Sequence, residues 1–311
     1  GHGFKPGMVW YKTRNETNDH NLSDSIRGAT YQVRPNRDIA QVNGTDLIKS
    51  FDTDGFTLGT GGDANASGDT YVAWSWKADD NEPTYNTNGS TNSVVSANAN
   101  AGFSIVKYTG TGSVATIGHG LSSAPTFIMI KALVATANSN WAVYHSGTGA
   151  GTHGLVLSTT DAPDDNAGYF NDTAPTSTVF TVGTYSVVNE SADDYIAYCF
   201  HDVTGYSKFG TYTGNGSAGK AITTGFKPDF VMIKSTVGSD NWRIYDTKRG
   251  IEKGGYLEPN RSDADDTSNA PGLTMTDTGF TITSGGVSIG DNADGNLYTY
   301  TAFAKNVASN T

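Results

Sequence analysis

Three segments of the chain share one pattern of polar and apolar positions. Each begins with a turn containing Gly and Pro, continues as an apolar, aromatic or β-branched run and ends on a lysine; the segments are Gly3–Lys12, Gly120–Lys131 and Gly225–Lys234. Gly and Pro mark turns, and the run that follows is typical of a strand. The three lysines lie 119 and 103 residues apart. The pattern therefore predicts a strand that recurs about once per small domain.

Three further features recur in the same order after this segment. Alternating apolar and polar residues predict half-buried strands at Asp54–Gly59, Thr178–Gly183 and Thr278–Ile282. A Tyr-x-Ala-aromatic pattern, starting at Tyr71, Tyr195 and Tyr300, predicts a strand whose aromatic side chains pack in the core. A glycine follows each repeated lysine by 16 residues, at Gly28, Gly147 and Gly250. The first and third copies carry a basic residue before this glycine and the second does not, so the second copy has diverged there.

These patterns predict an all-β protein made of three tandem antiparallel β-sandwich repeats of jelly-roll or lectin-like type. We expect the repeats at residues 1–78, 103–205 and 206–311. Residues 79–102 are polar and rich in Asn, Ser and Ala, so we expect a linker or an exposed extension there. A single three-bladed toroid is the less favoured alternative, because blades usually contain about 40–50 residues.

A Tyr-Thr-Gly strand precedes the recurring segment in two copies only, at Lys107–Ser113 and Thr211–Ser217. The chain has no counterpart upstream of residue 1, and Gly1–Gly3 aligns with the interior Gly118–Gly120. We therefore expect the chain to continue from residue 1 into an unseen N-terminal strand. The alternative is that residues 85–102 supply this strand.

Composition narrows the classes of partner. The 311 residues carry a formal net charge of −11 and contain no Lys/Arg cluster, which argues against nucleic acid as a partner. No apolar run approaches the about 20 residues that span a bilayer, so we expect no membrane insertion. Cys199 is the only cysteine, which excludes an intrachain disulfide, and its apolar neighbours predict a buried small side chain.

Four segments together resemble a repeat found in structural proteins of tailed bacteriophages, particularly marine ones. These are Asp24–Ala29, Ser50–Gly59, Tyr71–Lys77 and Gly225–Lys234. The resemblance covers most of the chain and is strongest in the first and third copies. It implies a component of the virion, an extracellular particle, such as a tail, fibre or decoration protein with lectin-like domains beside other virion proteins. The family has no catalytic signature that could be transferred to this chain.

Two tryptophans have the surroundings of a sugar-binding site. Trp141 follows Asn140, and Trp242 follows Asn241, at equivalent places in the second and third copies. An exposed ring can stack on a pyranose while amide groups bond its hydroxyls. The same residues are also typical of the start of a buried strand, which is the favoured interpretation.

Several carboxylate-rich turns contain the oxygen ligands that Ca²⁺ prefers. The turns are Asp161–Asn166, Asp263–Asp266 and Asp291–Asn296, and Asp265 with Asp266 is the pair singled out. A solvated turn is the favoured interpretation. No His or Cys spacing indicates zinc, and no other cofactor is expected.

No convincing set of catalytic residues is present. The chain has no Gly-x-Ser-x-Gly nucleophile motif, and no carboxylate pair stands out for glycoside hydrolysis. The leading hypothesis is a non-enzymatic phage virion protein, a tail or fibre module that contacts host-surface glycans and gains avidity from repeated sites in a homo-oligomer. The alternatives are a polysaccharide-degrading enzyme or its carbohydrate-binding appendage, and a bacterial surface adhesin.

Overall fold

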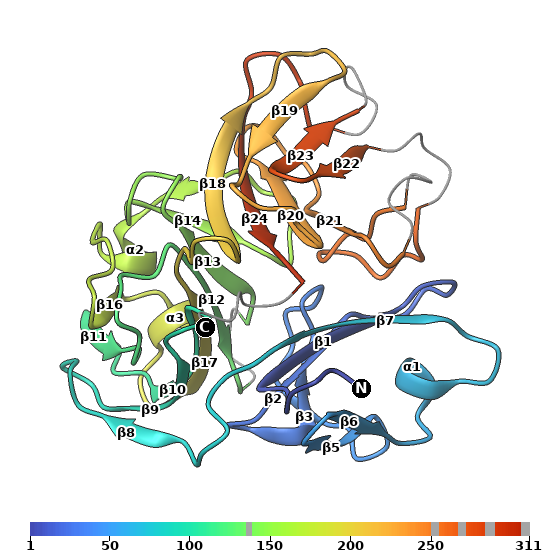
Figure 1. Cartoon of the computed structure of the whole chain (residues 1–311). Helices are drawn as coiled ribbons and strands as arrows, with labels where there is room; N and C mark the ends of the chain where they lie inside the picture. The colour runs from blue at the N-terminus through green and yellow to red at the C-terminus, as the bar shows by residue number, and fades with distance from the viewer. Residues whose placement is uncertain (135–138, 250–254, 267–271, 284–289, 306–311) are drawn as a thin grey trace.

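A computed structural model describes residues 1–134, 139–249, 255–266, 272–283 and 290–305 of the chain. Over these ranges the protein is β-rich with antiparallel sheets, which confirms the predicted all-β class (Figure 1). The helices among the described residues have four residues each: α1 (Gly62–Asn65), α2 (Ala167–Phe170) and α3 (Ser186–Asn189). Within the same ranges, no helix is long and apolar enough to cross a membrane.

Three large sheets contain most of the strands. The first sheet has the order β4-β3-β2-β1-β7 and consists of β1 (Met8–Thr13), β2 (Asn21–Asp24), β3 (Gly28–Val33), β4 (Val42–Asn43) and β7 (Tyr71–Trp76). The second sheet has the order β15-β14-β13-β12-β17-β10-β9-β8 and consists of β8 (Thr84–Asn86), β9 (Ser93–Asn98), β10 (Phe103–Thr109), β12 (Phe127–Ala132), β13 (Trp141–His145), β14 (His153–Val156), β15 (Asp164–Asp165) and β17 (Asp194–Phe200). The third sheet has the order β18-β24-β20-β21 and consists of β18 (Ser207–Thr213), β20 (Phe230–Ser235), β21 (Arg243–Asp246) and β24 (Leu297–Phe303).

Three small sheets complete the described β structure. They are β5 (Ile48–Asp52) with β6 (Gly55–Leu58), β11 (Ala115–Gly118) with β16 (Val179–Val182), and β19 (Lys220–Thr223) with β23 (Gly279–Ile282) and β22 (Leu273–Thr276). The predicted alternating strands correspond to β6, β16 and β23. Each small sheet shares a buried apolar cluster with one of the large sheets. These pairs of layers fit the β-sandwich class.

The recurring segment occupies the same position in each large sheet. Its strand (β1, β12 or β20) lies between the Tyr-x-Ala strand (β7, β17 or β24) and the following strand (β2, β13 or β21). The residue after the repeated lysine pairs with Tyr71 in the first sheet, Tyr195 in the second and Tyr298 in the third. The predicted counterpart Tyr300 is therefore displaced by two residues.

The turn glycines confirm one sequence alignment and correct another. Gly3, Gly120 and Gly225 all have a left-handed φ, between 72° and 90°, which glycine adopts without a Cβ penalty. Gly28 has φ 94°, and its counterpart in the second sheet is Gly149 with φ 99°, two residues after the predicted Gly147. The connection from β12 to β13 is longer than that from β1 to β2, which causes this shift. Gly250 lies outside the described residues.

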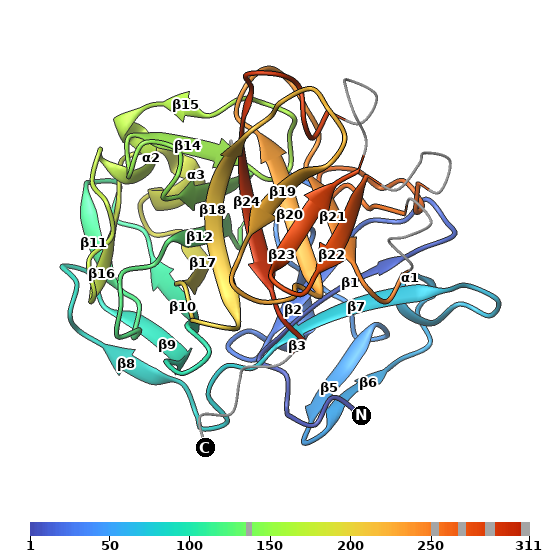
Figure 2. The ribbon, with the colours of Figure 1, turned by 45° about the horizontal axis from the view of Figure 1, so that its top comes forward.

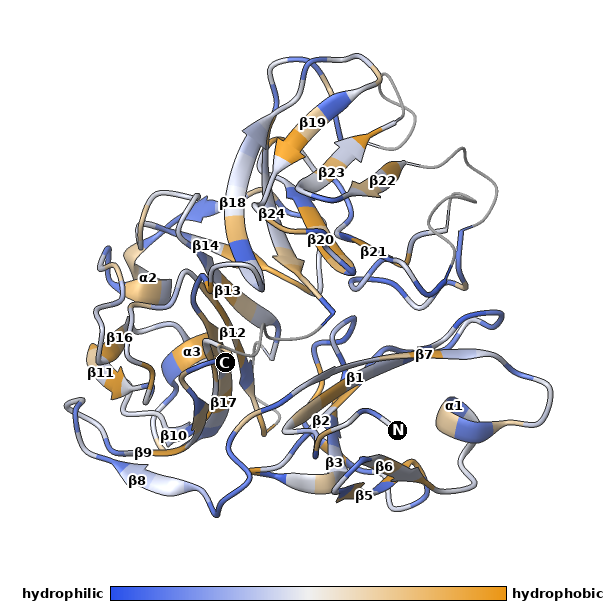
Figure 3. Cartoon of the chain, in the orientation of Figure 1, coloured by the Kyte–Doolittle hydropathy of each residue, from blue (hydrophilic) through white to orange (hydrophobic). Residues whose placement is uncertain are grey.

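The inner faces of the three large sheets surround one shared core, and the sheets lie around a common centre in Figures 1 and 2. At this centre Trp76, Phe200 and Phe303, one from each sheet, form a triangle of rings with centroids 5.5 to 6.3 Å apart. Hydrophobic colour in Figure 3 is mostly on the strands and hydrophilic colour on the loops. The predicted aromatic stripe is therefore core, and this core belongs to three sheets at once.

Residues 79–102 do not form a linker, which corrects one of the two predicted alternatives, whereas residues 79–92 are mostly exposed, as predicted for an extension. They contain β8 and β9, and β9 pairs with β10 along Phe103–Tyr108, so both strands extend the second sheet. Ser93, Val95 and Ser96 are buried. Small hydroxyl side chains can be buried in a strand without a long apolar run, which explains why composition suggested exposure. This pairing also means that residues 85–102 do not supply an outer strand to the first sheet.

Candidate functional site

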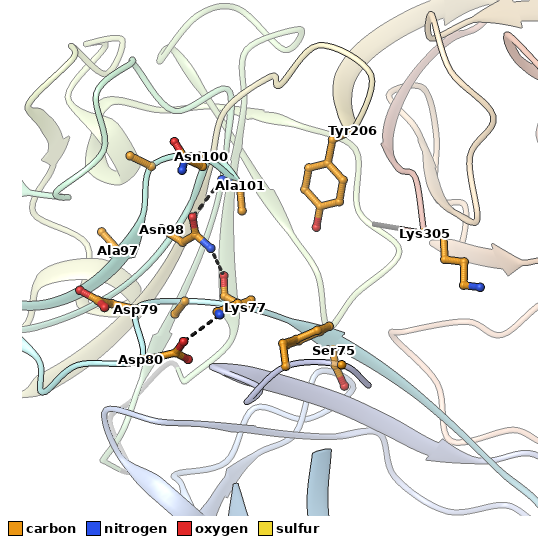
Figure 4. Close-up of a pocket in the computed structure, with 14 residues that line it drawn as sticks. Ser75, Lys77, Asp79, Asp80, Ala97, Asn98, Asn100, Ala101, Tyr206 and Lys305 are labelled. Carbon is orange, nitrogen blue, oxygen red and sulfur yellow. Dashed lines mark hydrogen bonds and ion pairs between the residues drawn. The ribbon is translucent and has the colours of Figure 1, made fainter. Parts of the chain in front are cut away.

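A pocket of about 820 Å³ opens at the end of β7, between the first two large sheets and residues that flank the third (Figure 4). Polar and apolar residues both line it, and it is called the polar pocket below. Ser75 lies in β7, and Lys77 is the residue that follows β7. Asn98 is the last residue of β9. Tyr206 and Lys305 come from the start and the end of the third sheet's region. The pocket therefore exists only because the three sheets pack together.

Hydrogen bonds hold one wall of this pocket in place. The Lys77 ammonium lies 2.7 Å from Asp80, and Asn98 donates to the Lys77 carbonyl at 3.3 Å. The Ala101 amide donates to the Asn98 side-chain oxygen at 3.1 Å. Figure 4 shows the Tyr206 side chain extending into the opening from the opposite side. This arrangement offers fixed carboxylate, amide and ammonium groups to a polar ligand.

Tyr206 contributes a neutral hydroxyl to the pocket. Its side chain is mostly buried, and this burial raises the pKa of Tyr206 to about 12. The phenol is therefore protonated at neutral pH and can donate or accept a hydrogen bond. The pocket lining includes neither a histidine nor a cysteine. Its groups can exchange hydrogen bonds with a polar ligand.

The structure buries both tryptophans that were candidates for sugar binding, as the favoured interpretation of a buried strand start expected. Trp141 is 0% exposed and Trp242 is 2% exposed. The Trp141 indole donates to the Arg34 carbonyl of the first sheet's region at 2.9 Å, and the Trp242 indole donates to the Val156 carbonyl of the second sheet at 3.0 Å. Neither ring face is open to a pyranose, so these indoles join neighbouring sheets and do not form stacking platforms.

The two neighbouring asparagines stabilise loops. The Asn140 side-chain oxygen accepts from Ser158 at 2.8 Å. The Asn241 amide donates to Glu258 at 2.9 Å, and its oxygen accepts from Asn260 at 2.6 Å. The interpretation of Asn-Trp as the start of a buried strand fits these contacts. The candidate sugar site at Asn140, Trp141, Asn241 and Trp242 is therefore wrong.

The predicted calcium pair is engaged by protein groups. Asp265 accepts from Arg14 and from Arg249, each at 2.8 Å, and Asp266 accepts from the Tyr256 hydroxyl at 2.8 Å. Two guanidinium groups already neutralise Asp265, which removes its advantage as a ligand for a cation. Among the residues that the structure describes, no group of three or more His, Cys, Asp or Glu side chains could hold a metal ion.

The three repeated lysines are buried, which sequence analysis did not predict. Lys12, Lys131 and Lys234 are each 0% exposed. Their ammonium groups donate to backbone carbonyls: Lys12 to Thr13 and Glu16, Lys131 to Ser139, and Lys234 to Thr160 and Asp240. Burial lowers their pKa values to about 8, about 7 and about 8 respectively. These lysines fix the loops around their strands, and Lys234 reaches a loop of the second sheet's region.

A buried ion pair connects the first sheet to the second. Asp24 and Arg27 lie 2.5 Å apart, with side chains 0% and 2% exposed. The Tyr198 hydroxyl of the second sheet donates to Asp24 at 2.7 Å, and Arg27 donates to the same hydroxyl at 3.3 Å. The sequence showed the Asp-x-x-Arg spacing but not its distant partner.

The equivalent ion pair of the third sheet connects it to the first. Arg249 lies 2.5 Å from Asp246 and also bonds Asp265. The Trp74 indole of β7 donates to Asp246 at 3.2 Å, and the Arg249 guanidinium lies over the Trp74 ring. Trp74 and Tyr198 occupy equivalent positions in their strands. The same contact is therefore made at two boundaries between sheets.

The second sheet makes its corresponding contact with the third through His145. His145 pairs with Phe127 as Asp24 pairs with Met8. Its Nδ1 accepts from the Gly147 amide at 3.0 Å, so Nε2 carries the proton and donates to the Tyr300 carbonyl at 3.2 Å. Each large sheet thus contacts the next in a closed ring.

Comparison with known proteins places the chain in a family without giving it an activity. No curated protein and no solved structure matches the chain. One family model matches residues 1–306, a range that includes all three large sheets. The chain belongs to the family described as a domain of unknown function, DUF7483.

Proposed function

We propose that this protein is a non-enzymatic structural component of a bacteriophage particle, a tail or fibre module made of three tandem β-sandwich repeats. The observation that carries the proposal is the shared core, in which three similarly paired sheets form one block. The ring of buried polar contacts supports it further, because a rigid block suits a part that is assembled and loaded mechanically. The resemblance of the repeated segments to phage structural proteins supplies the virion context.

Within this proposal, contact with host glycans takes place at the polar pocket and not at the buried tryptophans. The pocket combines the amides of Asn98 and Asn100 with the carboxylates of Asp79 and Asp80 and the phenol of Tyr206. Such groups hydrogen-bond sugar hydroxyls, and a ring beside them can contact a pyranose. Each site would bind weakly, and a homo-oligomer in the particle would multiply the affinity.

Purified phage particles that carry the gene test the virion proposal. Immunogold electron microscopy with an antibody against the chain should label the tail or fibres, and mass spectrometry should find its peptides in the particles. The absence of both label and peptides would overturn the proposal.

A glycan array tests the pocket separately. Wild-type protein should bind a subset of bacterial surface glycans, and Asn100→Ala should weaken that binding by about tenfold, as expected for losing one or two hydrogen bonds. The matched control is Asn88→Ala, an exposed asparagine outside the pocket. Equal binding by both variants, or no binding by wild type, contradicts a glycan site here.

A further inference from the structure

Two loops that lie far apart in the sequence contain the same turn. Residues 34–37 follow β3 and residues 258–261 lie between β21 and β22, and both end in the sequence Pro-Asn-Arg. In each turn the amide of the fourth residue donates to the carbonyl of the first, at 3.1 Å for Arg37 and 2.9 Å for Arg261. Proline is favoured at the second position of such a turn. The shared sequence therefore builds one local structure twice.

The asparagine of each turn has a structural role. The Asn36 side-chain oxygen accepts from the His20 amide at 3.0 Å, and the Asn260 side-chain oxygen accepts from the Trp242 amide at 3.0 Å. Each asparagine also donates, at 2.6 Å, to the side chain of the residue before this histidine or tryptophan. These bonds tie each turn to the start of a neighbouring strand, and they fix the place of the arginine that follows.

The arginine of each turn is exposed, unlike the other arginines of the chain. The Arg37 side chain is 50% exposed and the Arg261 side chain is 52% exposed. The other five arginines are at most 30% exposed, because each of them lies in an ion pair at or near a boundary between sheets. The two most accessible guanidinium groups of the chain therefore come from the two copies of this turn.

Both guanidinium groups keep donors that the protein does not use. Arg37 reaches Asp19 only through Nη1, at 3.5 Å, and its guanidinium has no other hydrogen-bond partner within the described ranges. Arg261 contacts Asp263 and Glu258 through Nε alone, and its two terminal nitrogens have no partner among the described residues. Since a guanidinium has five N–H donors, each group can still bind a ligand.

The tertiary structure brings the two turns together in one cleft of about 250 Å³. The first sheet's region and the third sheet's region both line it, through Asp19, Asn36, Arg37, Asn260, Arg261, Ser262 and Asp263. None of these residues lines the polar pocket. The second copy has no such turn, because residues 103–205 contain no arginine. The cleft is smaller than the about 300–1,000 Å³ typical of pockets for drug-sized molecules, so it suits one small polar group or a single sugar ring.

The carboxylates of the cleft are already engaged. Asp19 accepts from Asn36 at one oxygen and from Arg34 at the other, so Arg34 neutralises the carboxylate nearest Arg37. Asp263 accepts from Arg261 at one oxygen. The cleft therefore has more unused donors than its own acceptors can fill, and a ligand must supply the acceptors. An oxyanion supplies two or more oxygens in the geometry that a guanidinium fork matches.

We propose that this cleft binds an oxyanion, the carboxylate, phosphate or sulfate group of a ligand, through the guanidinium groups of Arg37 and Arg261. When the oxyanion belongs to an acidic sugar, the Ser262 hydroxyl beside it can bond a sugar hydroxyl. The Kd for the isolated group is roughly millimolar, because half-exposed charges stay hydrated and gain little from pairing. The proposal depends neither on the virion assignment nor on glycan binding at the polar pocket.

NMR spectra of the arginine Nε–H groups test the proposal, because the chain contains only seven arginines. The protein is titrated in mildly acidic buffer with phosphate, sulfate and glucuronate, and added chloride keeps the ionic strength constant. Glucose is the neutral counterpart of glucuronate. The Arg37 and Arg261 signals should shift saturably with an oxyanion and not with glucose. A response to glucuronate alone identifies an acidic sugar as the source, and a response to all three identifies a general oxyanion site.

Substitutions separate the guanidinium fork from general charge. Arg37→Gln and Arg261→Gln should each weaken binding at least about tenfold, as expected for the loss of a charge-assisted hydrogen bond. Arg37→Lys keeps the charge but not the fork and should weaken binding at least about threefold. The matched control is Lys227→Gln, which removes a 59% exposed cation outside the cleft and should bind within about twofold of wild type. Thermal unfolding checks that each variant keeps its fold.

Three results would overturn the proposal. The first is the absence of a saturable shift at Arg37 and Arg261 with all three oxyanions. The second is an equal response to glucose and glucuronate, which would mean that the cleft recognises hydroxyls and not charge. The third is an equal loss of affinity in Arg37→Gln and Lys227→Gln, or no loss in either, which would mean that the anions respond to the diffuse charge of the surface.

Discussion

The boundaries between the large sheets use two chemistries at one equivalent position. Asp24 and Asp246 each pair with an arginine three residues later and contact the neighbouring Tyr-x-Ala strand. His145 reaches its neighbour as a neutral ring with both nitrogens bonded. The position therefore requires a polar side chain that can reach across the boundary, and charge is one of two ways to provide it.

The difference matters because charge is costly to bury. A buried ion pair must offset the desolvation of two groups, and removal of one partner leaves the other uncompensated. A neutral histidine avoids that cost, but it lowers the stability of the folded protein at a pH where the unfolded chain protonates the same histidine. Different conditions should therefore destabilise the three boundaries between the sheets.

The largest expected effect follows the loss of Arg249. Arg249→Met leaves the carboxylates of Asp246 and Asp265 without this partner and should lower the free energy of unfolding by about 3–5 kcal/mol. Arg27→Met leaves only the Asp24 carboxylate without its partner. The free energy of unfolding should therefore fall by about 3 kcal/mol, the lower end of this range. Urea titrations at pH 7 measure both.

Arg261→Met is the control, because the Arg261 side chain is 52% exposed in its ion pairs with Glu258 and Asp263. It should change the free energy of unfolding by less than about 0.5 kcal/mol. If Arg249→Met is as mild as this control, the ion pairs do not hold the boundaries together.

The histidine boundary should be the acid-sensitive one. Burial lowers the pKa of His145 to about 4, although the hydrogen bond to the Tyr300 carbonyl and, to a smaller extent, Asp202 oppose the shift. Below about pH 6.5 the unfolded chain binds a proton that the folded protein refuses, so stability falls as the pH drops from about 6.5 toward 4. From pH 7 to pH 5 this site alone should remove about 2 kcal/mol.

His145→Gln keeps a side-chain amide that can reach the Tyr300 carbonyl but does not titrate. The wild-type protein should lose about 2 kcal/mol more than this variant between pH 7 and pH 5, measured by urea unfolding. Parallel pH profiles for the two proteins would show that His145 does not titrate as the geometry implies.

The buried lysines predict a pH dependence of the same sign at higher pH. Burial lowers the pKa of Lys131 to about 7, so above pH 7 the unfolded chain holds a proton that the folded protein has released. Stability from this site is lost at low pH and rises with pH from about 7 toward 10.5, by up to about 1.4 kcal/mol per pH unit.

Lys131→Met tests this slope, since Lys12 and Lys234 remain in both proteins. The difference in unfolding free energy between wild type and variant should increase in favour of wild type from pH 7 to pH 9. A constant difference would mean that the Lys131 ammonium is not desolvated as its burial indicates.

The smallest expected effect concerns the tryptophan hydrogen bonds. Trp141→Phe and Trp242→Phe each remove one bond to a carbonyl of a neighbouring sheet and should cost about 1–2 kcal/mol. Trp10→Phe removes a bond to His20 within the first sheet and serves as the matched comparison. If the first two variants lose no more stability than a surface substitution, these bonds do not support the boundaries.

Much of the local structure could be read from the sequence. The period-two strands, the left-handed turn glycines and the recurring strand that ends in lysine all depend on contacts between near neighbours. The alignment error at Gly147 arose because the second copy has a longer connection between its strands. The error at Tyr300 arose because β24 contains two tyrosines, Tyr298 and Tyr300, and the Tyr-x-Ala pattern matched the second of them. The strands of residues 79–102 were missed because small polar residues line them.

The candidate sites could not be predicted from the sequence, because the same residue types occur both in ligand sites and in contacts between sheets. An Asn-Trp pair looks alike whether its ring meets a sugar or a neighbouring sheet, and Asp265 looks alike whether it meets Ca²⁺ or Arg249. The polar pocket could not be found from sequence, because Lys77, Asn98, Tyr206 and Lys305 are distributed over most of the chain.

The sequence by itself determined where the strands lie and which of their side chains are apolar, because alternation and turn chemistry act over a few residues. Only the tertiary structure decided that the inner faces of three sheets share one core. It also decided that their lysines and tryptophans are buried. Many of these features depend on contacts between residues far apart in the chain, such as Trp141 with Arg34 and Trp242 with Val156. No local pattern records which face of a strand meets which distant neighbour.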